Sequence, residues 1–211
     1  MAAVPETPVT AKLRLGWDDG RIVAPELARQ LEEVGVKLIT IHGRTTEMAF
    51  GGNVRLDGIA GVVAAVKRIP VVGNGDIRTP QDAVKMMQQT GCAGVMIGRG
   101  ALSAPWLFRD VWSYLTTGTI PPRMTLEEKC QVLRDHFGLM VKLRGERPAV
   151  CEFRQRVTWY AKQMKPSKLL REGMCRMKSA EEFERAIRDF LEWRKTPEAL
   201  AAAARQPEAY A

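Results

Sequence analysis

Short apolar runs rich in β-branched residues alternate with amphipathic stretches along the first hundred residues. The apolar runs predict strands that are buried in a sheet. The stretches between them repeat apolar residues every three or four positions, which is the spacing of one helical face. The predicted strands are Pro8–Leu15, Val36–His42, Pro70–Asn74 and Ala93–Ile97.

Three helices are predicted between these strands. The first covers Pro25–Val34 and ends before Gly35, a residue suited to a left-handed C-cap. The third begins with Thr79 as N-cap and Pro80 at the first helical position, and it ends at Gly91. The apolar faces of the three helices are Leu27, Leu31 and Val34; Ile59, Val62, Val63 and Val66; and Ala83, Met86 and Met87.

This repeated strand–helix unit predicts an α/β fold with a parallel sheet, either doubly wound or a (β/α)8 barrel. Periodicity leaves both open, but polar residues follow every predicted strand at its carboxyl end. That placement favours a barrel, whose active sites lie at this face, and a Gly-Arg turn suits a phosphate. The strand-end residues are Lys12, Arg14, His42, Gly43, Arg44, Asn74, Gly75, Asp76, Gly98 and Arg99.

A different pattern begins after the turn formers of residues 116–122. Thr125 and Glu128 form a capping box that opens a helix to about Leu143. The next helix carries one apolar face and one basic face that includes Arg154, Lys162 and Lys165. We expect three parts: a partial barrel at 1–120, an all-α helical domain at 121–195 and a disordered tail at 196–211.

Charge is concentrated in the second part. The chain has a formal net charge of +8, and residues 142–178 hold eleven Lys or Arg against three Asp or Glu, whereas the remainder is balanced. A segment of this kind suits a polyanion such as nucleic acid. A solvated basic surface is the alternative.

The four cysteines have no CxxC spacing, which fits free thiols in a cytoplasmic protein better than disulfides or a zinc site. The only two histidines are His42 and His136, so we expect no metal site. No apolar run approaches the ~18 residues of a membrane span, and residues 1–6 lack the features of a signal peptide. We therefore expect no membrane partner.

Several segments together resemble the tRNA-dihydrouridine synthases, flavin enzymes that reduce the uracil C5–C6 bond in tRNA. The resemblance covers roughly residues 8–190. Its motifs are Pro8–Trp17, Ile41–Thr45, Val72–Ile77, Met96–Ala101 with Pro105 and Trp106, and Phe153–Tyr160.

The resemblance implies FMN as cofactor, NADPH as reductant and tRNA as partner. Lys12 and His42 resemble the side chains at the flavin pyrimidine edge, and Gly98 with Arg99 resemble the FMN phosphate grip. Asn74, Gly75 and Asp76 resemble the flavin-contacting strand end. The residues expected to contact RNA are Arg154, Arg156, Lys162, Lys165, Lys168 and Arg171.

Two departures from the family pattern limit these expectations. The cysteine that acts as the family's acid is absent, so no catalytic residue is assigned here. The opening strands are also absent, which implies the C-terminal half of a (β/α)8 TIM barrel, whose partner would be the N-terminal half. We expect the chain alone to be inactive; the alternatives are a non-catalytic RNA-binding protein and a flavin oxidoreductase acting on a small molecule.

Overall fold

The structure is a computed structural model that describes residues 6–205. The chain forms two compact units. One runs to Ala101 and includes Trp106–Ile120, and the other comprises Leu102–Pro105 and the chain from Pro121 onward. In the described residues, no helix combines the length and the apolar character needed to cross a bilayer.

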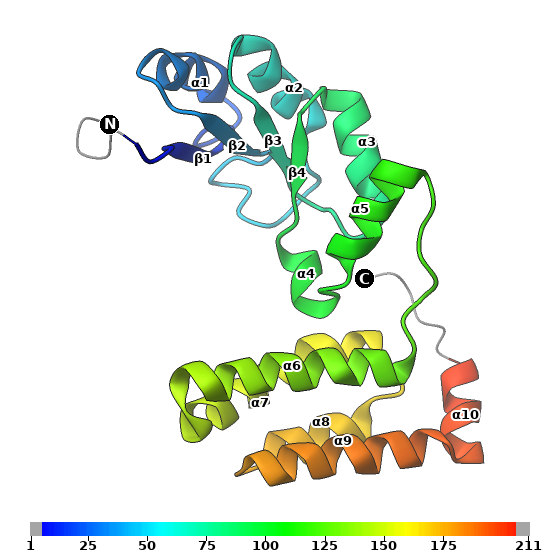
Figure 1. Cartoon of the computed structure of the whole chain (residues 1–211). Coiled ribbons are helices and arrows are strands. Elements are labelled where there is room, and N and C mark those ends of the chain that lie inside the picture. The colour runs from blue at the N-terminus through cyan, green and yellow to red at the C-terminus, as the bar shows by residue number, and fades with distance from the viewer. Residues whose placement is uncertain (1–5, 206–211) are drawn as a thin grey trace. The chain divides into compact units, whose positions relative to one another are not determined.

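The first unit is an α/β structure built on four parallel strands in the order β1-β2-β3-β4 (Figure 1). The predicted alternation of strands and helices is confirmed, as in consecutive units of a TIM barrel. Its elements are β1 (Thr10–Arg14), α1 (Ala24–Glu33), β2 (Leu38–His42), α2 (Leu56–Ala65), β3 (Val71–Asn74), α3 (Pro80–Thr90), β4 (Gly94–Met96) and α5 (Leu107–Thr117). The short helix α4 (Arg99–Ser103) begins in this unit and ends in the Leu102–Pro105 segment of the other.

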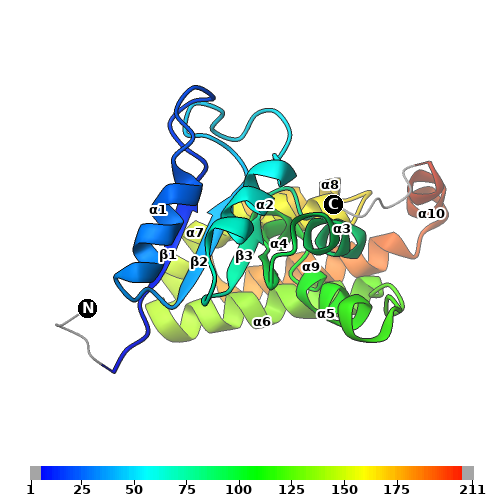
Figure 2. The same ribbon diagram turned by 90° about the horizontal axis from the view of Figure 1, so that it is seen from above.

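The helices of this unit pack in sequence order, α1 against α2, α2 against α3 and α3 against α5 (Figure 2). The core between strands and helices includes Ile39, Ile41, Ile59 and Val62, all fully buried. This arrangement leaves the strand ends as the part of the unit where polar side chains gather.

Local sequence signals fix the helix ends. Thr79 and Asp82 form a reciprocal capping box at the start of α3, and Gly91 ends the helix at φ 70°. α4 and α5, which the apolar periodicity did not predict, follow β4 directly, and α5 ends at Gly118 with φ 72°. The turn-former segment therefore begins inside the last turn of α5.

The second unit is wholly helical. Phe137, Phe153 and Phe183 meet at its centre, with the Phe137 and Phe183 rings stacked at a centroid distance of 4.1 Å. His136 Nδ1 lies 2.8 Å from Tyr160 Oη, which gives this histidine a structural partner. The helices are α6 (Leu126–Arg144), α7 (Glu146–Tyr160), α8 (Lys168–Arg176), α9 (Ala180–Arg194) and α10 (Pro197–Ala204), with a 3-10 turn, η1 (Ala161–Gln163), after α7.

Helix α10 corrects the expectation of a disordered tail from residue 196. Thr196 caps α10 by accepting a hydrogen bond from the Ala199 N–H, and Pro197 stands at the first helical turn. The alanine run resembles a low-complexity segment, but alanine has the highest helix propensity of any residue type. Residues 206–211 of the expected tail lie outside the described residues.

Candidate functional site

The strand register brings the predicted site residues of the first unit into one row. Arg14 pairs with His42, His42 with Asn74, and Asn74 with Met96, so these four residues lie side by side at the carboxyl ends of the four strands. Lys12 precedes Arg14 by two residues and shares its face of β1. Parallel pairing thus assembles a polar edge from segments more than eighty residues apart in sequence.

Lys12 and Asn74 are joined across this edge. Lys12 Nζ donates a 3.3 Å hydrogen bond to Asn74 Oδ1, and Asn74 Nδ2 donates to the Met96 carbonyl at 2.8 Å. Partial burial, and then repulsion from the Arg14 guanidinium, lower the pKa of Lys12 from its ordinary value. Asn74 therefore holds the lysine in place while itself fixed by the last strand.

His42 lies within this row and is 6% exposed. Burial, followed by the positive charges of Arg14, Lys12 and Arg44, lowers the pKa of His42 to about 4. At neutral pH the imidazole is uncharged, so His42 offers one N–H donor and one nitrogen acceptor. Of the two residues predicted for the flavin pyrimidine edge, only Lys12 carries positive charge.

An ion pair with a buried guanidinium lies beside the histidine. The Arg44 side chain is 2% exposed, and its guanidinium contacts both oxygens of Asp76, at 3.1 and 2.5 Å. The same guanidinium donates to the carbonyls of Gly51 and Gly52 at 2.8 and 2.6 Å. Arg44 thus ties the loop after β2 to the loop after β3.

Asp76 links this pair to the predicted phosphate grip. Burial alone would raise the pKa of Asp76, but hydrogen bonds from Arg44 and the charges of Arg44 and Arg99 lower it below its usual range. Asp76 Oδ1 lies 3.1 Å from Arg99 Nη2, and its backbone adopts a left-handed φ of 49°. The carboxylate therefore remains ionised and orients Arg99.

Arg99 is half exposed at the outer end of this network. Its guanidinium lies 4.9 Å from the centroid of the Phe50 ring, and the Arg14 guanidinium lies 5.7 Å from the same ring. Arg14 also donates to the carbonyls of Thr45 and Ala49, at 2.7 and 2.9 Å. Two arginines accordingly hold the loop that carries Phe50.

Two glycines shape the edge. Gly75 has φ 131°, and a Cβ there would come within 2.3 Å of Val54, so glycine is required at this turn. Gly98 is the opposite case, because a Cβ would meet no atom within 4 Å. The approach to Gly98 and the Arg99 guanidinium is therefore open to a ligand.

The edge fits an anionic cofactor with a polar ring. Lys12 and Arg99 supply positive charge, His42 supplies a neutral hydrogen-bonding group, and Gly98 offers backbone that a ligand can approach. These residues could hold FMN, with its ring toward Lys12 and its phosphate toward Arg99. Among the described residues, no group of three or more His, Cys, Asp or Glu side chains is arranged to hold a metal ion.

The residues expected to contact RNA fall into two groups in the helical unit. Lys162, Lys165, Lys168 and Arg171 are exposed, on the turn after α7 and on α8. The other two are engaged internally. Arg154 donates twice to the Met177 carbonyl, at 2.9 and 2.6 Å, and Arg156 pairs with Glu152 at 3.1 Å.

Pattern reasoning placed Arg14 and Arg44 at the strand ends but gave neither of them a role, and it did not assign Phe50 to the site. The sequence signal for Arg44 was its place one residue after a strand-end glycine, but a charged residue there suggests a surface loop. Its burial follows from contacts with Asp76 and with two loop carbonyls, which no local pattern encodes.

Comparisons with known proteins identify the family. Residues 1–195 match the family described as Dihydrouridine synthase (Dus). The probable tRNA-dihydrouridine synthase 1 of Synechocystis is 35% identical over 86% of this chain and 51% of its own. The probable tRNA-dihydrouridine synthase of Rickettsia conorii is 39% identical over 73% of this chain and 46% of its own. The tRNA-dihydrouridine synthase B of Proteus vulgaris is 34% identical over 89% of this chain and 58% of its own length.

The chain spans about half the length of the curated relatives it matches. A solved nitroalkane oxidase from Streptomyces ansochromogenes is 21% identical, covers 48% of this chain and 37% of its own, and has a TM-score of 0.33, too low to bear on the fold. The family match extends over both units. The chain belongs to the dihydrouridine synthase (Dus) family.

Proposed function

We propose that this chain carries the FMN-binding edge and the RNA-binding helices of a tRNA-dihydrouridine synthase. Such an enzyme reduces the C5–C6 bond of uridine in tRNA, with NADPH as the electron source. The observation that carries the proposal is the polar edge at the strand ends, where His42 pairs with Asn74 and Lys12 hydrogen-bonds to Asn74. The Arg44–Asp76–Arg99 network lies beside them.

The chemistry that bound FMN supplies is hydride transfer, from NADPH to uracil C6. Lys12 would place its ammonium group beside the pyrimidine edge of the ring system, where reduction gathers negative charge around N1 and O2. His42, neutral at the pH of the cell, would hydrogen-bond at the same edge. Asn74 positions Lys12 through the 3.3 Å hydrogen bond.

At the opposite end, Arg99 would bind the phosphate of FMN. Its guanidinium is aimed by Asp76, which the buried Arg44 holds by contacts to both carboxylate oxygens. A guanidinium fixed in this way loses less conformational entropy when it binds a phosphate. Gly98 would let the ligand approach the backbone closely.

We assign the proton for uracil C5 to a residue outside this chain. Cys92 is buried in the first unit, with its Sγ close to Gly73 of β3. Burial raises the pKa of Cys130 to about 11, so its thiol stays protonated in the core of the helical unit. Cys151 and Cys175 lie on α7 and α8, in the helical unit.

The exposed basic residues of the helical unit would contact the phosphate backbone of the tRNA. The residues suited to this by their exposure are Lys162, Lys165, Lys168 and Arg171, of which Lys168 also lies 3.9 Å from Glu172 Oε1. Backbone contacts set register and orientation without reading sequence. The target base would then have to leave its stack to reach the flavin.

Two binding measurements on the purified chain test this function against its alternatives. We expect FMN binding, seen as a change in flavin fluorescence, and tRNA binding, seen as a rise in the anisotropy of a labelled transcript. Binding of tRNA without FMN would favour a non-catalytic RNA-binding protein. Binding of FMN with NADPH oxidation but without tRNA binding would favour a flavin oxidoreductase that acts on a small molecule.

A further inference from the structure

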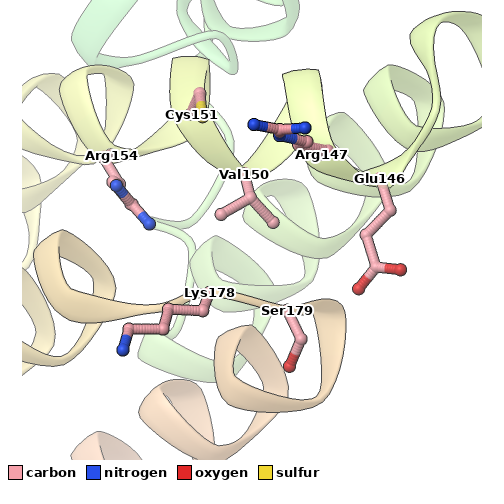
Figure 3. Close-up of a pocket in the computed structure, with 7 residues that line it drawn as sticks. All are labelled: Glu146, Arg147, Val150, Cys151, Arg154, Lys178 and Ser179. Atoms are coloured by element: carbon pink, nitrogen blue, oxygen red, sulfur yellow. The ribbon is translucent and has the colours of Figure 1, made fainter.

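A pocket of about 460 Å³ opens in the helical unit, where the start of α7 meets the residues leading into α9 (Figure 3). Three basic side chains line it, those of Arg147, Arg154 and Lys178. The volume lies within the roughly 300–1,000 Å³ typical of ligand sites. All three basic residues belong to the segment 142–178, which carries the charge excess of the chain.

The acidic residue of the pocket does not neutralise these groups. Glu146 Oε1 accepts a 2.7 Å hydrogen bond from the Ala180 N–H, at the start of α9. In Figure 3 the Glu146 carboxylate lies on the opposite side of Val150 from Arg154 and Lys178. The carboxylate therefore compensates the positive end of the α9 dipole, and the rest of the pocket keeps its positive charge.

Arg154 gives the pocket a rigid wall. Its Nε and Nη2 both donate to the Met177 carbonyl, which fixes the plane of the guanidinium and leaves N–H donors over. Val150, 2% exposed, adds an apolar lining beside it. Charges near such a surface are screened less by solvent than charges on a fully hydrated face.

Arg147 and Lys178 are exposed and complete the positive rim. A fixed guanidinium flanked by two exposed cations suits a phosphate group, because a guanidinium can bind two phosphate oxygens at once. A free phosphate ion and a phosphodiester in a polynucleotide share this chemistry. The continuation of the basic tract beyond the pocket favours the polynucleotide.

We propose that this pocket binds one phosphate of an RNA backbone, as an anchoring point additional to the lysines after α7. The proposal rests on the proposed RNA-binding function, because it names where the helical unit takes hold of the same partner. It predicts that Arg147 and Lys178 contribute to RNA affinity, although neither lies in the row of basic residues found from the helical pattern.

The test compares the full chain with the double variant Arg147→Gln, Lys178→Gln. Arg154 is left intact because it also supports the Met177 carbonyl. The matched control is Arg185→Gln, Arg188→Gln, which removes the same charge from exposed positions of α9 outside the pocket. Affinity for a labelled tRNA transcript is measured by fluorescence anisotropy at several salt concentrations.

We expect the pocket variant to bind tRNA about tenfold more weakly, with a salt dependence reduced by about one phosphate contact. The control should stay within about threefold of the parent chain. Equal affinity of the pocket variant and the control would overturn the proposal while leaving RNA binding intact. Failure of the parent chain to bind tRNA would overturn the proposed RNA-binding function and the pocket assignment together.

Inorganic phosphate separates the two possible sources of the ligand. If millimolar phosphate raises the melting temperature of the parent chain but not of the pocket variant, and tRNA affinity is the same in both, the pocket is a site for free phosphate. That result would overturn the RNA assignment. Loss of tRNA affinity in the pocket variant alone, with its melting temperature unchanged, supports it.

Discussion

At the scale of single residues, the site depends most on Arg44. This guanidinium is buried and contacts Asp76 and two loop carbonyls, so its removal takes one of its donors from the Asp76 carboxylate and takes a donor from each of the two carbonyl oxygens. We expect Arg44→Met to lower the free energy of unfolding by about 3 kcal/mol, since it breaks an ion pair whose guanidinium is buried and leaves partly buried acceptors without this donor. Urea denaturation followed by circular dichroism measures this.

The matched control is Arg55→Met, which breaks an ion pair with Asp19 in which the aspartate side chain is 76% exposed. Exposed pairs contribute at most about 1 kcal/mol. Equal urea midpoints for the two variants would show that Arg44 does not organise the edge.

His42 gives a prediction for pH. Its pKa of about 4 lies below the ordinary value of 6.5, so the unfolded chain binds a proton more readily than the folded one. Stability from this group is therefore complete above pH 6.5 and is lost as the pH falls toward 4, by roughly 3 kcal/mol in total.

NMR titration of the His42 ring protons measures the pKa directly. Among the neighbouring positive charges, that of Arg14 lowers the pKa of His42 most. We therefore expect Arg14→Gln to raise this pKa. His136→Gln assigns the two histidine resonances. An ordinary pKa near 6.5 for His42 in the parent chain would contradict the burial and charge described here.

Much of this site could be read from single residues, and the exceptions share one cause. The sequence pattern alone placed four of these residues at strand ends: Lys12, His42, Asn74 and Arg99. The strand register pairs His42 with Asn74, and a hydrogen bond joins Lys12 to Asn74. The pattern could not reveal that Asp76 serves Arg44 and Arg99, because that depends on loop geometry and on a left-handed backbone at Asp76.

At the scale of elements, Arg154 is a basic residue with a structural role, unlike the exposed lysines after α7. Its two hydrogen bonds to the Met177 carbonyl join α7 to the end of α8. Hydrogen bonds from charged groups contribute about 1.5–3 kcal/mol. We expect Arg154→Met to lower the free energy of unfolding by about 2 kcal/mol, measured by urea denaturation.

Lys165→Gln is the comparison for this element. Its side chain is exposed, so the free energy of unfolding should change by less than about 0.5 kcal/mol, while the affinity for tRNA falls. An unchanged free energy of unfolding in Arg154→Met would show that the hydrogen bonds to the Met177 carbonyl do not stabilise the fold.

Helix α1 shows where periodicity was insufficient. Leu27, Leu31 and Val34 share the predicted apolar face, yet Ala24, Ala28 and Glu32 are the buried residues, whereas Val34 is 65% exposed. Glu32 is buried because its carboxylate accepts the N–H groups of the turn before β3, from Lys67 to Ile69. Glu32, and not the predicted leucines, is buried on α1 because the turn before β3 needs a hydrogen-bond acceptor.

At the scale of the whole molecule, the first unit has two open sides. Within the described residues, β1 and β4 each pair with one neighbour, and apolar side chains are exposed on the flanking helices, Val34 beyond α1 and Phe108 and Trp112 on α5. Open strand edges and exposed apolar surface favour association between chains.

We therefore expect the chain to self-associate with rising concentration, measured by sedimentation velocity. Trp112→Glu, which places a charge on the exposed face of α5, should shift the distribution toward the monomer. Its control is Thr116→Glu, one turn further along the same helix and also exposed. A single monomeric species over a hundredfold range of concentration would show that these surfaces do not associate.

Fluorescence titrations with FMN and with riboflavin test whether the strand-end edge binds FMN with its phosphate at Arg99. Riboflavin lacks the phosphate. We expect the parent chain and the exposed control Arg78→Gln to bind FMN at least about tenfold more tightly than riboflavin, as loss of a charge-assisted hydrogen bond implies. In Arg99→Gln this preference should fall close to one. Equal affinity for FMN and riboflavin in the parent chain, or an unchanged preference in Arg99→Gln, would show that Arg99 does not bind the FMN phosphate.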